Sequence, residues 1–198
     1  GSTQTNTLEI ASYIKKTLDI DVAHHLTCVG ATPDHINDTM NMLLANDIHS
    51  IVALRGDPPK EEPEFMNAAS EFQHAEDLVH HIAESNAFSI AVAGYPETHI
   101  EAPSLQSDIR YLKQKVEAGA DAIITQLFYD NNDYFKFVEA CRDAAITVPI
   151  IPGLMPILDV NQIQRITSMC GAKIPPYLMQ ELLKTEGNPA ATHRLGIE

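Results

Sequence analysis

The sequence predicts an α/β fold with a parallel sheet, and within that class a (β/α)8 TIM barrel of which about five βα units are present. One observation is a recurring pattern, in which a short apolar run is followed by a polar or glycine-bearing cluster and then by an amphipathic helical stretch. Another is that neither Gly-x-Gly-x-x-Gly nor Gly-x-x-x-x-Gly-Lys occurs, although an open mononucleotide-binding sheet would favour them. Finally, polar residues follow nearly every apolar run, and the strand ends of a barrel converge on one face.

The predicted elements alternate along the whole chain. The predicted strands are 22–28, 50–57, 88–97, 121–130 and 148–156. The predicted helices are one containing Met40, Leu43 and Leu44, and others near 75–84, 104–118, 131–144 and 160–169. Only the loop at 58–72 is long, and nothing between the units has the composition of a linker. The sequence therefore predicts a single domain over 1–198, an incomplete barrel.

Composition excludes several classes of partner. Lys+Arg 13 against Asp+Glu 27 gives a net charge of −14, which argues against binding to nucleic acid or to an anionic membrane surface. No apolar run approaches the ~20 residues that span a bilayer. The three cysteines are widely spaced and form no Cys-x-x-Cys, so we expect reduced thiols in a cytoplasmic protein and no metal site.

The segment Arg55-Gly56-Asp57 ends a strand predicted to be buried on both faces. Asp57 precedes a proline, so a turn residue and a ligand contact are about equally favoured by the pattern alone. The tripeptide also matches a cell-adhesion motif, which the predicted compartment disfavours. His24 and His25 are expected to point to opposite faces of their strand, since side chains alternate. A lone strand histidine is more often structural than catalytic.

Two further features suggest a polar cavity. Gln126 lies within the apolar run IITQLF, where an unpaired amide would cost about 1–3 kcal/mol, so we expect it to face polar surroundings. The helix at 105–119 has a buried stripe of Ile109, Leu112 and Val116. Its residues Asp108, Tyr111 and Lys115 share another face, which is either a solvated surface or a face that reaches a cofactor phosphate.

Five segments in this order resemble the methylenetetrahydrofolate reductases: AHHLTC, IVALRGD, AGYPETHIEA, LKQKVEAGADAIITQLFYD and IIPGLMP. The resemblance implies a (β/α)8 barrel with FAD across the carboxyl ends of the strands. It also implies a ping-pong reaction, in which NADH or NADPH reduces the flavin and the flavin then reduces 5,10-methylenetetrahydrofolate to 5-methyltetrahydrofolate. The cofactor carries the redox chemistry, so few acid–base groups are expected.

The resemblance also implies roles for individual residues. The expected cofactor contacts are His25, Arg55, Gly56, Asp57, Ala75, Tyr95, His99, Ala102, Asp108, Tyr111, Gln114 and Lys115. Gln126 and Gln162 are the implied folate contacts, together with Asp57. The implied catalytic residues are Asp57 and Gln126, with the Asp57 carboxylate stabilising the cationic iminium form of the folate.

The chain departs from the family pattern at both ends. In the family, the first strand ends in the glutamate proposed to protonate the folate, and both that strand and the second are expected upstream of residue 1. The final strand and helix are also expected to lie outside the chain, so no residue here is assigned as the general acid. A non-catalytic flavin- or folate-binding fragment is the main alternative, and a flavin-free barrel for phosphorylated metabolites is a weaker one. The sequence leaves NADH versus NADPH open, and association into a homo-oligomer is expected.

Overall fold

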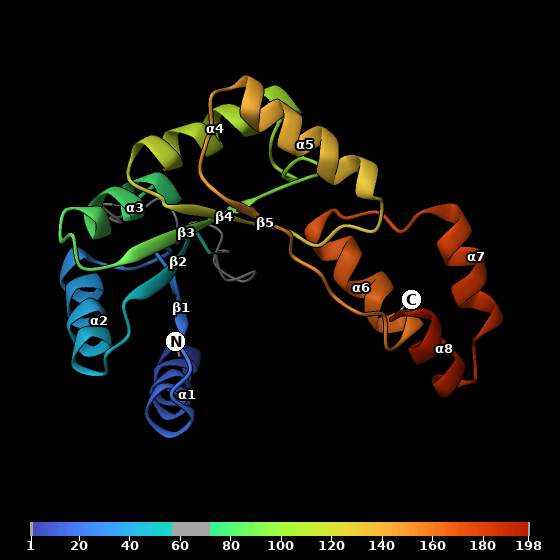
Figure 1. Cartoon of the computed structure of the whole chain (residues 1–198), viewed down its shortest axis with the longest axis horizontal. Helices are drawn as coiled ribbons and strands as arrows, with labels where there is room; N and C mark the ends of the chain where they lie inside the picture. The colour runs from blue at the N-terminus through green and yellow to red at the C-terminus, as the bar shows by residue number, and fades with distance from the viewer. Residues whose placement is uncertain (1, 57–71, 198) are drawn as a thin grey trace. The chain divides into compact units, whose positions relative to one another are not determined.

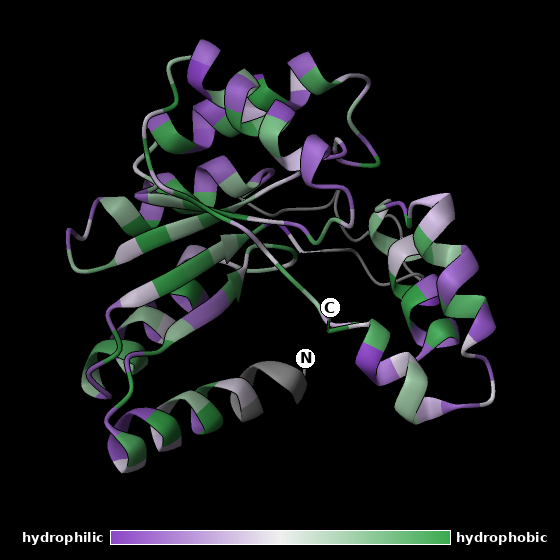
Figure 2. Ribbon diagram, turned by 45° about the vertical axis from the view of Figure 1, so that its right-hand side comes forward, coloured by the Kyte–Doolittle hydropathy of each residue, from purple (hydrophilic) through white to green (hydrophobic). Residues whose placement is uncertain are grey.

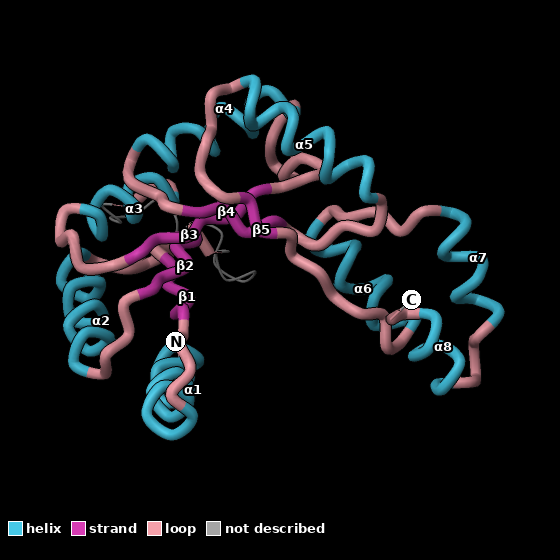
Figure 3. Tube along the Cα trace, in the orientation of Figure 1, coloured by secondary structure: helices cyan, strands magenta, loops and turns pink. Residues whose placement is uncertain are grey.

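The computed structural model describes residues 2–56 and 72–197 (Figure 1). Its strands are β1 (Ala23–Thr27), β2 (Ser50–Leu54), β3 (Ser89–Gly94), β4 (Ala122–Thr125) and β5 (Ile150–Ile151). Its helices are α1 (Ser2–Leu18), α2 (Pro33–Ala45), α3 (Ala75–Ala83), α4 (Leu105–Glu117), α5 (Asn131–Asp143), α6 (Val160–Cys170), α7 (Pro176–Lys184) and α8 (Pro189–Leu195). Strands and helices alternate from β1 to α6, as Figure 3 shows.

The strands follow one another across the sheet in chain order, β1-β2-β3-β4-β5. β1 pairs in parallel with β2, with Ala23 opposite Ser50 and Thr27 opposite Leu54. β2 in turn pairs in parallel with β3. Parallel strands joined by helices are the units of a (β/α)8 barrel, so the predicted fold class is consistent with the observed strand order.

The chain divides into two compact units. Unit 1 consists of Gly1–Ala93 and Gln114–Ile123, and unit 2 consists of Gly94–Lys113 and Ile124–Glu198. The division passes through β3, α4 and β4, so neither unit is a continuous stretch of the chain.

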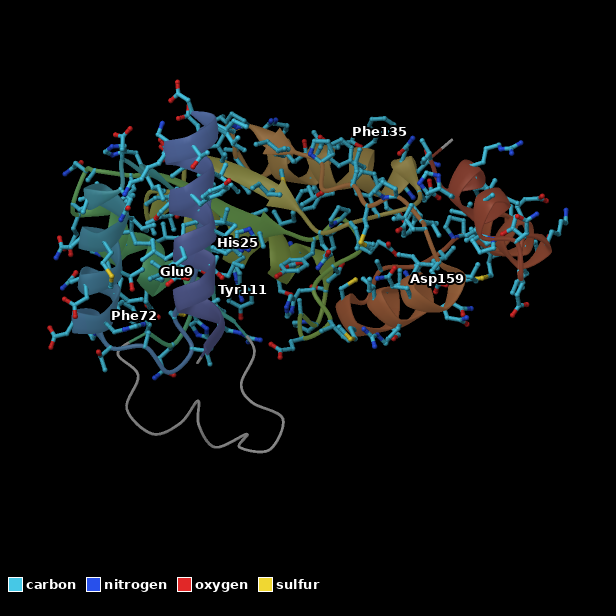
Figure 4. The ribbon with its side chains drawn as sticks, turned by 90° about the horizontal axis from the view of Figure 1, so that it is seen from below. Glu9, His25, Phe72, Tyr111, Phe135 and Asp159 are labelled. Atoms are coloured by element: carbon cyan, nitrogen blue, oxygen red, sulfur yellow. The ribbon has the colours of Figure 1, made fainter. Side chains whose placement is uncertain are left out.

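Side-chain caps explain where several helices begin. The Thr32 hydroxyl accepts a hydrogen bond from the N–H of His35 at 3.3 Å, and Pro33 occupies the first turn of α2. The Asp130 carboxylate accepts from the N–H of Asn132 at 2.9 Å at the start of α5. The Asp159 carboxylate, labelled in Figure 4, caps α6 in the same way. These polar residues satisfy helix N–H groups that have no partner within the helix.

Each unit has its own apolar packing. In unit 1 most of the buried apolar residues come from β1–β3 and from one stripe each of α2 and α3, including Leu26, Ile51, Ile36, Leu43 and Leu78. In unit 2 one cluster is formed by Ile157, Val160, Ile163 and Leu182. Figure 2 shows the sheet strands as largely hydrophobic and the helices as two-sided, the pattern expected when helices cover a sheet.

The predicted elements compare closely with the observed ones. Each of the five strands and each of the five helices is present, although the strands are shorter than expected and the last is reduced to Ile150–Ile151. Three helices, α1, α7 and α8, were not predicted. The apolar stripe of α4 is confirmed, since Ile109 and Leu112 are buried and Val116 is half-buried. Within the described residues, no helix combines the length and hydropathy needed to cross a membrane.

The expectation that His24 and His25 face opposite ways is confirmed. His24 is 2% exposed, whereas His25 is exposed. The strand register places His24 next to Ile51, on the same face as Leu26. The Nδ1 atom of His24 has no hydrogen-bond partner among the described residues. Burial, with a smaller effect from His25, lowers the pKa of His24 below the ordinary histidine value.

We expect His24 to make the stability of the chain depend on pH. Because its pKa is lower in the folded chain, the unfolded chain binds an extra proton once the pH falls below about 6.5. The contribution of neutral His24 to stability is therefore complete above this pH and is lost as the pH falls. Urea unfolding of the wild type between pH 7 and 5 should show this loss, and the His24→Leu variant should show a flatter profile. His80→Gln, an exposed change on α3, is the control and should keep the wild-type slope; equal slopes in all three proteins would contradict the prediction.

Candidate functional site

In unit 1, three of the predicted cofactor contacts lie on β1 or at the carboxyl end of β2. His25 is exposed on β1 (Figure 4). Arg55 and Gly56 follow β2, where Arg55 is half-buried and its Nε donates to the Gly56 carbonyl at 3.3 Å. Gly56 has φ +80°, and a Cβ at this position would lie 2.8 Å from Val29 Cγ1. A side chain at residue 56 is therefore excluded both by backbone conformation and by space.

The same strand ends are joined by a buried thiol. Cys28 follows β1, is 1% exposed, and its Sγ donates to the carbonyls of Arg55 at 3.5 Å and His74 at 3.7 Å. The N–H of Val29 also donates to the Arg55 carbonyl at 2.9 Å. Burial raises the pKa of Cys28 to about 11, so the thiol stays protonated and unreactive near neutral pH. We therefore assign Cys28 a structural role: it holds Arg55 in position.

Three further predicted contacts lie on helices of unit 1. Ala75 is the first residue of α3 and is half-buried. Gln114 lines a groove of about 710 Å³ together with residues of α3 such as His80 and His81. The Lys115 ammonium donates to the carbonyl of Ala93 in β3 at 2.7 Å. This contact places the Lys115 ammonium beside the backbone of β3, near the carboxyl end of that strand.

In unit 2, the segment 95–102 between β3 and α4 holds three of the predicted contacts in a hydrogen-bonded arrangement. The rings of Tyr95 and His99 pack edge to face, with centroids 4.5 Å apart. The Asp108 carboxylate accepts from the N–H of His99 at 2.8 Å, and the N–H of Ala102 donates to the His99 carbonyl at 2.8 Å. His99 Nδ1 accepts from the N–H of Glu101 at 3.1 Å. In the neutral ring the proton is then on Nε2, which can donate to a ligand.

The centre of this segment is strained. Thr98 has φ +72°, a left-handed conformation that is rare for a β-branched residue, and its N–H donates to the Tyr95 carbonyl at 3.0 Å. Strain of this kind costs about 1–3 kcal/mol and persists only where surrounding contacts enforce it.

Replacing Thr98 by glycine is expected to raise the free energy of unfolding by about 1 kcal/mol, because glycine removes the strain and adds a smaller entropy cost. Thermal and urea unfolding followed by circular dichroism measure the change. Thr147→Gly is the matched control: Thr147 is an exposed loop residue that is not among those with positive φ, so the same change there should be destabilising. Equal effects of the two substitutions would show that Thr98 is not strained.

Gln126 follows β4 directly. Its N–H donates to the Gly94 carbonyl at 2.8 Å, and its side-chain Oε1 accepts from the N–H of Leu127 at 2.9 Å. The neighbouring Thr125 hydroxyl accepts from the N–H of Gly153 at 2.9 Å. A Cβ on Gly153 would lie 2.0 Å from the Thr125 carbonyl oxygen, so the segment after β5 depends on glycine at this point.

The remaining predicted contacts are more exposed. Tyr111 is 50% exposed on α4, where the Arg110 guanidinium lies 5.1 Å from its ring centroid. Gln162 lies in the first turn of α6 with its side chain exposed, and its N–H is the one capped by Asp159. Asp57, predicted to be both catalytic and ligand-binding, lies outside the described residues.

Glu97 is a notable residue that the sequence assignments left out. Its side chain is 6% exposed, and both carboxylate oxygens accept from the N–H of Lys173, at 2.9 and 3.1 Å. A signal for it exists in the sequence, because an acidic residue follows closely on a buried strand between Pro96 and Thr98. Its partner is 76 residues away, and a distance of that kind cannot be read from local pattern.

The family model for methylenetetrahydrofolate reductase matches residues 1–198. The chain belongs to the methylenetetrahydrofolate reductase family. Members of this family named in the comparisons include the probable methylenetetrahydrofolate reductase (NADH) of Oryza sativa subsp. japonica, 41% identical over 208 residues. The 5,10-methylenetetrahydrofolate reductase of Escherichia coli (strain K12) is 40% identical over 176 residues.

The chain is shorter than these family members. The match to the rice protein takes in 100% of this chain and 35% of the relative. For the E. coli protein the figures are 88% and 57%. A relative from Caenorhabditis elegans, 38% identical over 98% of this chain and 29% of its own length, is named as a probable NADPH enzyme. The family thus includes members named for either nicotinamide nucleotide.

Solved structures support the fold class alone. The chain resembles 2,3-dimethylmalate lyase, a member of the PEP mutase/isocitrate lyase superfamily, with a TM-score of 0.54 and 9% identity over 97% of this chain and 72% of that one. It also resembles phosphonopyruvate hydrolase, with a TM-score of 0.51 and 15% identity over 95% and 70% of the two chains. The predicted α/β class and partial (β/α)8 barrel are confirmed.

Proposed function

We propose that this chain carries part of the catalytic barrel of a flavin-dependent reductase. The proposed reaction is reduction of 5,10-methylenetetrahydrofolate to 5-methyltetrahydrofolate with NADH or NADPH, in the cytoplasm and in a homo-oligomer. The observation that carries the proposal is the family match over residues 1–198, combined with 41% identity to a named reductase across the whole chain. When bound, FAD supplies the redox chemistry that links the nicotinamide nucleotide to the folate.

The described residues of unit 1 fit a phosphorylated cofactor. Arg55 and Lys115 provide cationic groups that are half-buried, near the ends of β2 and β3. Gly56 has φ +80°, and Val29 and Thr27 fill the space that a side chain would need, so the turn after β2 that carries Arg55 requires glycine. Partly buried cations bind phosphate more strongly than fully solvated ones because the local dielectric is lower.

The described residues of unit 2 fit the recognition of a ring system. Segment 95–102 presents the Tyr95 and His99 rings from a backbone held by hydrogen bonds, so little conformational entropy is lost when they bind a ligand. Gln126 offers an amide that can both donate and accept, which suits alternate contacts with a nicotinamide carboxamide and a pterin. We assign Gln126 and Gln162 to the folate, and Asp57 to stabilisation of positive charge on it.

A comparison of two rates tests this proposal. The chain is supplied with FAD, and NADH oxidation is measured first with an artificial electron acceptor and then with 5,10-methylenetetrahydrofolate. Replacing Asp57 by asparagine should slow the folate-dependent rate about tenfold or more and leave oxidation with the artificial acceptor within about threefold. Asp38→Asn, an exposed change on α2, is the matched control and should leave both rates unchanged. Equal slowing of both rates by Asp57→Asn would overturn the assigned role of Asp57.

A further inference from the structure

Glu97 is a buried carboxylate whose partner is distant in sequence. It lies in unit 2, three residues after β3, and its side chain is 6% exposed. Both oxygens accept from the backbone N–H of Lys173, in the segment between α6 and α7. The Lys173 ammonium is 3.7 Å from Oε2, but that side chain is 81% exposed. The short contacts are therefore to the Lys173 backbone, and the solvated ion pair adds little.

Burying the charged Glu97 carboxylate costs free energy, because the charge loses its hydration. Desolvation raises the pKa of Glu97, the Lys173 N–H and ammonium act in the opposite direction, and Asp133 adds a further unfavourable charge. A buried carboxylate that is not fully compensated persists when it serves a specific arrangement of the backbone. The residues on either side of Glu97 show which part of the backbone it holds.

Glu97 lies inside the segment that carries the Tyr95 and His99 rings. Thr98, its immediate neighbour, has the strained φ of +72°. After Thr98, the segment is held by the hydrogen bond that the His99 N–H donates to the Asp108 carboxylate. Glu97 supplies the second attachment, to a segment 76 residues further along the chain.

The two segments also approach each other closely at a neighbouring point. Gly171, with φ +77°, ends α6, and a Cβ built on it would lie 3.7 Å from the Ile100 Cβ. Residues 97–100 therefore lie beside residues 171–173, with Glu97 bonded to Lys173 and Ile100 close to Gly171. The helix α6 that ends here carries Gln162 in its first turn, so the contact links segment 95–102 to the helix assigned to folate.

We propose that Glu97 is a positioning residue, which fixes the Tyr95–His99 segment by accepting the Lys173 backbone N–H and thereby ties this segment to the C-terminal end of α6. The role deepens the proposed function and rests on it. Glu97 acts through Tyr95 and His99, whose arrangement it maintains.

The test uses five substitutions in the 198-residue chain. Glu97→Ala removes both acceptor oxygens, Glu97→Asp keeps the charge but shortens its reach, and Glu97→Gln keeps one acceptor oxygen at full reach. Lys173→Ala removes the ammonium and leaves the backbone N–H in place. Ile146→Val changes a buried residue elsewhere in unit 2. It controls for a general loss of stability, because Ile146 lies outside segment 95–102.

Two quantities are measured for each variant: amide hydrogen exchange of residues 98–102 and 173, and the FAD dissociation constant from quenching of flavin fluorescence. We expect Glu97→Ala and Glu97→Asp to speed exchange of the Lys173 amide about tenfold and to raise the dissociation constant by a similar factor. Glu97→Gln should remain within about threefold of wild type. Lys173→Ala and Ile146→Val should match wild type in both measurements.

Other results would overturn the inference. Lys173→Ala matching Glu97→Ala would assign the effect to the ammonium. Faster exchange with an unchanged dissociation constant would leave Glu97 a purely structural role. If the wild-type chain bound no FAD, the proposed function would be wrong, but the role of Glu97 in holding segment 95–102 could still be tested by amide exchange. Unchanged exchange of residues 98–102 in Glu97→Ala and Glu97→Asp would refute that role. If Glu97→Ala does not fold, the difference in amide exchange and FAD dissociation constant between Glu97→Asp and Glu97→Gln provides the same test.

Discussion

Replacing Phe137 by alanine is expected to lower the free energy of unfolding by about 3–5 kcal/mol, the usual cost of emptying a fully buried aromatic site. Phe137 is 1% exposed on α5, and Cys141, one turn later on the same face, is also buried. Removing the ring leaves a cavity that a packed helix closes only in part, so lost burial and the cavity both contribute.

The same helix provides a matched control. Phe135 is 63% exposed and lies two positions before Phe137, on the other side of the helix (Figure 4). Phe135→Ala should change the free energy of unfolding by about 0.5 kcal/mol or less. Urea unfolding followed by circular dichroism gives both values. Similar losses for the two variants would mean that α5 does not pack as described.

Replacing Gly153 by alanine is expected to cost about 3 kcal/mol and to disturb the position of Gln126. The new Cβ would lie 2.0 Å from the Thr125 carbonyl oxygen and 3.1 Å from its carbon. Both are backbone atoms of β4, so no rotamer change can relieve the overlap. The strand end or the segment after β5 must move, and the hydrogen bond from the Gly153 N–H to the Thr125 hydroxyl is strained with it.

Gly187→Ala separates this overlap from the general cost of replacing glycine. Gly187 has φ +80° with no atom within 4 Å of its built Cβ, so alanine there should cost about 1 kcal/mol through backbone strain alone. Urea unfolding measures stability, and amide exchange at Gln126, whose N–H bonds to Gly94, reports local displacement. A Gly153→Ala variant as stable as Gly187→Ala, with unchanged exchange at Gln126, would contradict the prediction.

Much of the fold could be predicted because it follows from the local spacing of apolar and polar residues. The strand–helix alternation, the opposite orientations of His24 and His25 and the buried stripe of α4 follow from spacing alone. Helices α7 and α8 were missed because short segments beginning at Pro176 and Pro189 resemble loops until a capping or packing partner is known. β5 is shorter than its apolar run because Pro152 and Gly153 follow it at once.

The residues of the candidate site were named one by one from the sequence, but the contacts that hold them were not predicted. Tyr95, His99 and Asp108 were named from the family motif, and the structure brings them together in one hydrogen-bonded segment. The buried Glu97 carboxylate depends on a contact with Lys173, 76 residues along the chain, for which the sequence has no local signal. The backbone contact between Gly153 and Thr125 is of the same kind, because nothing in IIPGLMP shows which atom the glycine must approach.

The most direct measurement is the visible absorption spectrum of the purified chain after incubation with FAD and removal of the unbound cofactor, with circular dichroism to establish that the chain is folded. We predict a bound-flavin spectrum for the wild type, a weaker one for His99→Ala and Lys115→Ala, and an unchanged one for the exposed control Asp38→Asn. A folded wild-type chain that retains no flavin would contradict the proposal that the chain binds FAD, and would favour a family member without the cofactor.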